Sequence, residues 1–176
     1  LLNIVCLYNP NLIQSMDIRT IISAIAYYIL PFPIFFYLMH KLKARTIEKK
    51  SLTIKKFLLY LCITISLMWI GNLLGNIITI ILGHLMSSEI VNPVVRIIQN
   101  SNVYINFIIL CIIAPTFEEI FFRKLLIDRT IKYGATLSVI LSAILFGLFH
   151  GNLNQFFYTF LIGGFFAYVY IQTGNI

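Results

Sequence analysis

The sequence predicts an all-α fold, a polytopic bundle of transmembrane helices. The 176 residues are 60% hydrophobic and 11% charged, whereas soluble globular domains are about a quarter charged and less than half apolar. Long apolar runs also alternate with short polar loops of differing basic charge. Because the net charge of +7 is concentrated in those loops, it indicates membrane topology and not nucleic-acid binding.

Five apolar runs are predicted as membrane helices. They cover about residues 20–39, 57–82, 103 onward, 135–149 and 156–171. The second is long enough to cross a hydrocarbon core of about 30 Å with tilt. Pro31 and Pro33 predict a kink in the first. Residues 1–16 are either the end of another span or an interfacial piece.

Positive charge is concentrated in residues 40–56, which carry seven Lys or Arg against Glu48. The positive-inside rule predicts that this loop is cytoplasmic. Residues 84–102 are nearly neutral, which suits the outer side, and the basic run at 123–132 returns to the inner side. We therefore expect a multi-pass protein of the cell membrane, with the lipid bilayer as its surroundings.

The cysteine and glycine patterns say less about the fold than the apolar runs do. The three cysteines lie far apart in apolar surroundings, so they indicate neither a disulfide framework nor a zinc cluster. Gly71 and Gly75 form a small-xxx-small pattern, which lets two helices approach closely, either inside one bundle or across a dimer face. The oligomeric state does not follow from the sequence.

Residues 114–126, APTFEEIFFRKLL, place two adjacent carboxylates in one of the most apolar stretches of the chain. Ionisable groups inside a membrane segment usually have a function. Pro115 predicts that the span from Val103 breaks or kinks near Ala114 and that a new helix begins there. Glu118 and Glu119 would then lie in a first turn, where the helix dipole favours negative charge.

Helical spacing predicts the neighbours of these carboxylates. Glu119 and Arg123 are four residues apart, in the favourable order for an ion pair on one helix face. About 21 Å of helix separates Glu118 from Lys132 before the turn, and about 25 Å returns to His150, at a rise of ~1.5 Å per residue. Glu118 and His150 are therefore expected at similar depth.

A carboxylate beside an imidazole can activate water, with Glu118 as general base and His150 orienting the water or moving its proton. Spacing alone fits equally well a Glu–Arg cluster that only locks helices together, and a proton-coupled transporter could use the same acids as a relay. Glu118, Glu119, His150 and Asn154 could offer metal ligands, but no HExxH is present. We therefore predict neither a metal site nor a cofactor.

Two short motifs resemble a known family. EEIFFR, Glu118 to Arg123, is similar to the EExxxR motif of the CAAX protease and bacteriocin-processing (CPBP, or Abi) family of intramembrane proteases, and FGLFH, Phe146 to His150, is similar to its FxxxH motif. This family is related to the type II CAAX prenyl endopeptidases. The resemblance covers about residues 105–176. It implies a helical membrane fold with a cavity open to peptide substrates.

The resemblance also implies residue roles. Glu118 and His150 would be catalytic, and the residues in a supporting role would be Glu119, Arg123, Phe146 and, as an added candidate, Asn154. The implied organisation is an N-terminal part, residues 1–102, followed by a catalytic core, residues 103–176. A further His-xxx-Asn motif of the family does not occur before Ile176, so we expect a fold that is incomplete at the C-terminus.

The implied activity is that of a membrane hydrolase, an endopeptidase acting on a peptide or lipidated protein. Bacteriocin processing or immunity is typical of the family. The alternative within the same fold is a non-catalytic immunity or scaffold protein. Substitution of Glu118 separates these two, because only the protease depends on that carboxylate.

Overall fold

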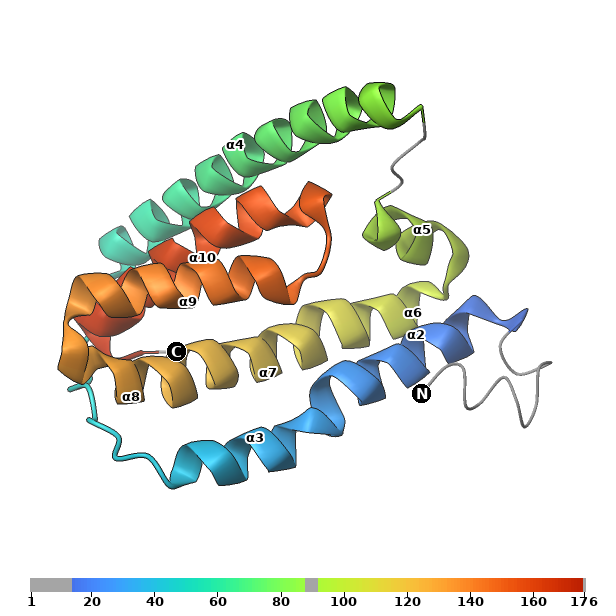
Figure 1. Ribbon diagram of the computed structural model, residues 1–176. Coiled ribbons are helices and arrows are strands. Elements are labelled where there is room, and N and C mark those ends of the chain that lie inside the picture. Colours follow the sequence, from blue (N-terminus) through green and yellow to red (C-terminus); the bar gives the residue numbers. More distant parts are fainter. Residues whose placement is uncertain (1–13, 88–91, 176) are drawn as a thin grey trace. The chain divides into compact units, whose positions relative to one another are not determined.

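The computed structural model describes residues 14–87 and 92–175, which form helices joined by turns and one extended segment, with no strand among them (Figure 1). This confirms the all-α prediction. The chain divides into two compact units, each made of two separate stretches. Unit 1 contains Leu1–Leu42 and Val91–Glu119, and unit 2 contains Lys43–Ile90 and Ile120–Ile176. The predicted division at residue 102 concerns functional organisation and stays a prediction.

The predicted apolar runs are all helical. In the described part of the chain, the helices long and apolar enough to cross a membrane are Met16–His40, Ile54–Met86, Val103–Tyr133 and Leu153–Thr173. The remaining predicted span forms α9 (Ala135–Phe149) with the expected bounds, although its 15 residues are fewer than a perpendicular crossing needs. The N-terminal piece, residues 1–16, lies almost entirely outside the described residues.

The first span belongs to unit 1 and contains a π-helical interruption. Its elements are α2 (Met16–Ala24), a π-helical segment (Ile25–Ile29) and α3 (Pro31–His40). The N–H of Leu30 donates to the carbonyl of Ile25, five residues back, at 2.9 Å. This wider register lets the helix pass Pro31, whose ring nitrogen cannot donate. Figure 1 shows the helix axis bending between α2 and α3, as the prolines predict.

The helix is continuous from Val103 to Tyr133, so the predicted break near Ala114, with a new helix starting at Pro115, is wrong; the alternative of a kink there stays a prediction. A π-helical segment again precedes the proline, and the N–H of Ala114 donates to the carbonyl of Ile109. The change of register lets the helix continue although Pro115 has no N–H to donate. The glutamates therefore lie inside a helix and not at its N-terminus, so the helix dipole does not stabilise them.

This long helix is built from alternating α and π segments. In order they are α6 (Val103–Asn106), a π segment (Phe107–Ile113), α7 (Ala114–Glu119), a second π segment (Ile120–Ile127), α8 (Asp128–Thr130) and a 3-10 turn (Ile131–Tyr133). A short amphipathic helix, α5 (Pro93–Asn100), precedes it and packs against α2 within unit 1. π segments inside α-helices are frequent at functional sites.

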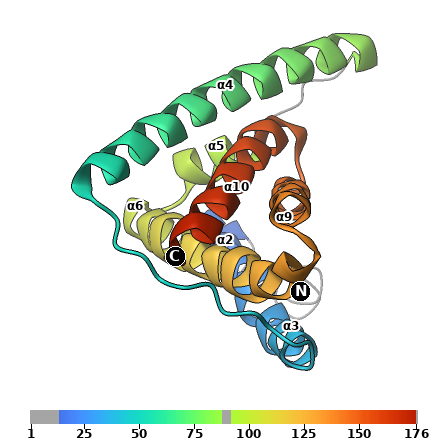
Figure 2. The ribbon, with the colours of Figure 1, turned by 90° about the vertical axis from the view of Figure 1, so that its left-hand side faces the viewer.

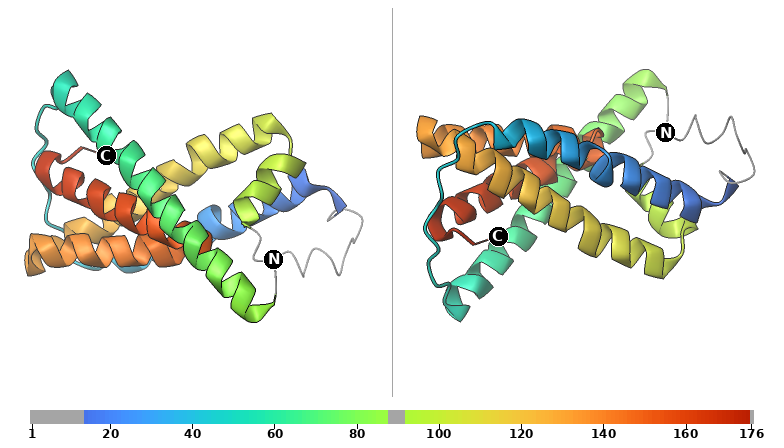
Figure 3. Two further views of the ribbon diagram at one scale, coloured as in Figure 1. Left: turned by 90° about the horizontal axis from the view of Figure 1, so that it is seen from above. Right: turned by 90° about the horizontal axis from the view of Figure 1, so that it is seen from below.

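In unit 2, α10 (Leu153–Thr173) packs against both α9 and α4 (Ile54–Met86), and Figure 3 shows α4 crossing α10. Glycine permits this crossing. A Cβ added at Gly71 would overlap the Cα of Tyr158, and one at Gly75 would lie 2.6 Å from the carbonyl oxygen of Asn154. The small-xxx-small pattern therefore packs inside the bundle, which is one of the two predicted uses.

The basic loop between α3 and α4 continues into an extended segment, residues 43–53, here called the strap (Figure 2). Backbone hydrogen bonds hold it to unit 2. The N–H of Arg45 donates to the carbonyl of Asp128 at 2.6 Å, and the N–H of Lys50 donates to that of Thr173 at 2.8 Å. Ile47 packs against a buried cluster that includes Tyr170. The cytoplasmic side of this loop stays a prediction.

Candidate active site

His150 directly follows α9, and its imidazole is held in one orientation. Its Nδ1 lies 2.9 Å from the carbonyl oxygen of Phe146. Because a carbonyl only accepts, Nδ1 carries the proton, and in the neutral imidazole Nε2 then carries the lone pair. The ring packs edge-on against Phe146, with centroids 5.0 Å apart, and also contacts Phe149 and Tyr158. The four-residue spacing of FxxxH is thus the spacing of one backbone hydrogen bond and one ring contact.

The turn after His150 is fixed by Asn152, the N-cap of α10. Its Oδ1 accepts from the N–H of Gln155 at 3.0 Å, and its Nδ2 donates to Oε1 of Gln155 at 2.7 Å and to the carbonyl of His150 at 3.1 Å. This capping role of Asn152 is not among the predictions from sequence. The signal was present, since Asn followed three residues later by Gln is a capping-box pattern.

Arg123 is fully buried, with none of its surface exposed. One terminal nitrogen donates to Oγ of Ser142 on α9 at 2.9 Å. The guanidinium lies 5.3 Å from the ring centre of Phe146 and 5.9 Å from that of Phe166, within cation–π range. Arg123 therefore links its own helix to α9 and α10, and it packs on the residue that orients His150. The predicted ion pair with Glu119 stays a prediction.

Glu118 is half-buried and accepts a hydrogen bond from the hydroxyl of Tyr28 on the first span, at 2.9 Å. Phe117 packs beside this pair, with its ring centre 6.1 Å from that of Tyr28 and 5.0 Å from that of Phe32. Tyr28 thereby holds the carboxylate in one rotamer. Sequence reasoning missed Tyr28, because nothing in its apolar surroundings distinguishes it from the adjacent Tyr27.

Asn154, the added supporting candidate, is buried at the crossing of α10 and α4. Its Oδ1 accepts from the hydroxyl of Thr79. This contact ties the two helices together through polar groups, which is a common means of association inside membranes. The supporting role predicted for Asn154 in catalysis stays a prediction.

Unit 2 therefore brings three of the six predicted site residues together, Arg123, Phe146 and His150, in one chain of contacts. Glu118 and Glu119 belong to unit 1, where Glu118 contacts Tyr28. The pairing of Glu118 with His150 stays a prediction.

The sequence offers Glu118, Glu119, His150 and Asn154 as possible metal ligands, so the grouping of such side chains bears on whether a metal could bind. Among residues 14–87 and 92–175, no three His, Cys, Asp or Glu side chains lie close enough together to hold a metal ion. A catalytic zinc usually takes three protein ligands. The expectation that the protein needs no metal stays a prediction.

Comparison with known proteins gives one finding. Residues 100–176 match the family model described as type II CAAX prenyl endopeptidase Rce1-like. Neither the curated proteins nor the solved structures contain a significant match. The matched segment includes both EEIFFR and FGLFH. The resemblance to the CAAX protease family is therefore confirmed over residues 100–176, the part of the chain that carries both motifs.

Proposed function

We propose that this protein is an intramembrane endopeptidase that hydrolyses a peptide bond in a membrane-associated peptide or lipidated protein. The matched family is a protease family, and the described helices are long and apolar enough to place the reaction in a membrane. The observation that carries the proposal is the state of His150. With Nδ1 bonded to the carbonyl of Phe146, Nε2 is the nitrogen that can accept a proton.

In the proposed reaction, the Glu118 carboxylate takes a proton from water while the water oxygen bonds to the substrate carbonyl carbon. The Nε2 atom of His150 accepts the second hydrogen bond of that water and orients it. The tetrahedral intermediate then collapses, the C–N bond breaks, and the proton held by Glu118 passes to the leaving amine. Tyr28, which donates to Oε1 of Glu118, keeps the base in position.

Helix register supports this pairing. Within unit 2, the ring centre of Phe122 lies 5.0 Å from that of Phe146 and 5.6 Å from that of Phe149. The helix that carries Phe122 therefore runs beside α9 at the level of its last turn. Glu118 precedes Phe122 by about one helical turn on the same continuous helix. The pairing of Glu118 with His150 therefore rests on their spacing along the chain and not on a measured contact.

The test is cleavage of a membrane-associated peptide by the full-length protein in proteoliposomes. We expect Glu118→Gln and His150→Ala each to lower the rate by on the order of 10²- to 10⁴-fold, the usual contribution of general acid–base groups. Glu48→Gln and His84→Ala are matched controls, because they make the same changes at exposed positions. A chelator arm tests the prediction that no metal is needed, and activity should persist in it.

Other outcomes identify the competing functions. Full activity of either variant would contradict the mechanism. A wild-type protein that inserts and binds peptide without cutting it would indicate a non-catalytic immunity or scaffold role. Solute uptake that depends on an ion gradient and is lost in Glu118→Gln would indicate a proton-coupled transporter.

A further inference from the structure

Unit 1 also contains a pocket whose lining includes none of the candidate catalytic residues. A pocket of about 260 Å³ is formed between the first turns of α2 and the helix α5. Two guanidinium side chains line it, those of Arg19 and Arg96, together with the hydroxyl residues Thr20 and Ser23. The other lining residues are apolar and include Ile97. The lining thus carries two positive charges and no carboxylate.

The α2 wall of the pocket is anchored to the turn between α5 and α6. The hydroxyl of Thr20 donates to the carbonyl of Met16 at 2.9 Å and lies 3.1 Å from Oγ of Ser101. Because a hydroxyl has one hydrogen, Ser101 is the donor in the second bond. Asp17 accepts from the N–H of Asn102 at 2.5 Å, which also ties α2 to this turn.

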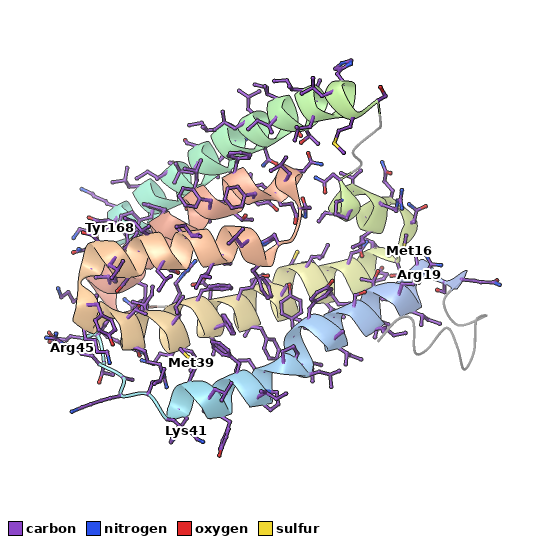
Figure 4. All side chains as sticks on the ribbon, in the orientation of Figure 1. Met16, Arg19, Met39, Lys41, Arg45 and Tyr168 are labelled. Atoms are coloured by element: carbon purple, nitrogen blue, oxygen red, sulfur yellow. The ribbon has the colours of Figure 1, made fainter. Side chains whose placement is uncertain are left out.

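The N-cap of α5 is also fixed, since Oδ1 of Asn92 accepts from the N–H of Val94 at 3.0 Å. Arg96 therefore projects from a capped helix and Arg19 from a helix tied to the adjacent turn. Figure 4 shows Arg19 and Met16 at this end of α2. Two guanidinium groups on separately anchored elements are suited to one anion held between them.

The position of the pocket along the membrane normal indicates which class of ligand it can bind. Helix Met16–His40 has 25 residues, about 37 Å at a rise of ~1.5 Å per residue, against a hydrocarbon core of about 30 Å. Arg19 is the fourth residue of this helix, so it lies at headgroup level when the helix spans the bilayer. A phospholipid presents its phosphate at that level and its acyl chains toward the apolar lining.

We propose that this pocket binds a phosphate group, presented by the headgroup of an anionic phospholipid. Arg19 and Arg96 contact the phosphate oxygens, Ser23 donates to the same group, and Ile97 faces the first part of an acyl chain. A soluble phosphate shares the recognised chemistry, so the test separates the two sources.

The experiment uses the full chain in nanodiscs of phosphatidylcholine with increasing phosphatidylglycerol, and native mass spectrometry counts the phosphatidylglycerol retained. We expect saturable retention by the wild type. Arg96→Gln and Arg19→Gln should each weaken it about tenfold, the loss expected for one charge-assisted hydrogen bond. Arg45→Gln removes an equal charge outside the pocket. Its strap contact uses only the backbone N–H of Arg45, so retention should change less than about twofold.

Arg96→Lys keeps the charge but not the two-pronged donor geometry, and we expect an intermediate affinity. If Arg96→Gln lowers the thermal midpoint of the lipid-free protein, Arg96→Lys takes its place as the variant that tests the site. Millimolar inorganic phosphate added as competitor should leave the retained lipid unchanged. If inorganic phosphate displaces the lipid, the pocket takes a soluble phosphate and the lipid assignment is overturned. Equal losses in Arg45→Gln and Arg96→Gln would overturn the site itself, because retention would then follow net charge.

Discussion

The two units of this protein differ in which residue shapes their helices, proline in unit 1 and glycine in unit 2. All five prolines of the chain lie in unit 1, and all nine glycines lie in unit 2. In unit 1, Pro31 and Pro115 each follow a π-helical segment, and Pro93 begins α5. In unit 2, Gly71 and Gly75 bring α4 against α10. Proline changes helix register, whereas glycine lets two helices touch.

Burial follows the same division. Among the described residues, the large side chains that are almost completely buried, including Arg123, Tyr170 and Phe122, lie in unit 2. The buried residues described in unit 1 are smaller, namely Thr20, Ala24, Asn106, Ile109 and Ala114. Unit 2 is therefore stabilised by close packing, whereas unit 1 depends more on local polar anchors. We expect substitutions in unit 2 to reduce stability most, and substitutions in unit 1 to affect activity more than stability.

The largest expected stability effect is at the closest helix contact of unit 2. Gly71→Val should lower the free energy of unfolding by about 3 kcal/mol, because its side chain would occupy the position of the Tyr158 backbone and force α4 away from α10. Reversible unfolding in mixed micelles measures this change. Leu73→Ala on the same helix is the control, since Leu73 is 62% exposed, and its effect should stay below about 1 kcal/mol. Equal effects of both changes would contradict the packing role of Gly71.

A smaller effect is expected where α10 holds α8 and the strap. The buried carboxylate of Asp128 accepts from the hydroxyl of Tyr170 at 2.8 Å and pairs with Lys124 at 2.8 Å. Tyr170→Phe removes one of these contacts and should cost about 1–2 kcal/mol of unfolding free energy. Tyr168→Phe makes the same change at an exposed position on the same helix (Figure 4).

The Tyr168 variant should be neutral in thermal unfolding. In the Tyr170 variant, limited proteolysis should also cut the strap faster, because the carbonyl of Asp128 accepts from the N–H of Arg45. A stable Tyr170 variant with an unchanged strap would show that Asp128 is held by Lys124 alone.

Much of this architecture follows from local signals in the sequence. Apolar runs predict the helices, and the spacing of Gly71 and Gly75 predicts a close helix contact. The FxxxH spacing also predicts the contact of His150 with Phe146, since the two residues lie about one helical turn apart. These features depend on residues close together in the chain, so periodicity is sufficient to find them.

Long-range partners could not be predicted in this way. Tyr28 is 90 residues from Glu118 and Ser142 is 19 from Arg123, and neither belongs to a pattern that names its partner. The strap pairs through backbone groups, which every residue but proline carries. The helix break expected at Pro115 is absent from the structure for another reason. Proline normally interrupts an α-helix, but a π segment before it shifts the register and keeps the helix continuous.

The smallest expected stability effect concerns Pro115 itself. Pro115→Ala restores a backbone donor, so the π segment Phe107–Ile113 can return to α register. Because the helix is already continuous in the wild type, the unfolding free energy should change by less than about 1 kcal/mol. Converting a π turn to an α turn, however, rotates Glu118 by about 100° relative to Val103. Cleavage should therefore fall much more than stability.

Pro93→Ala separates this register effect from the loss of a proline ring. Pro93 is at the first position of α5, where no helical hydrogen bond is missing, so its replacement should leave the register of every helix unchanged. Both variants are compared by thermal midpoint and by cleavage rate in the same proteoliposomes. Loss of cleavage in Pro115→Ala alone would connect proline placement in unit 1 to the orientation of the proposed base. Equal cleavage by both variants and the wild type would show that the π register does not orient Glu118.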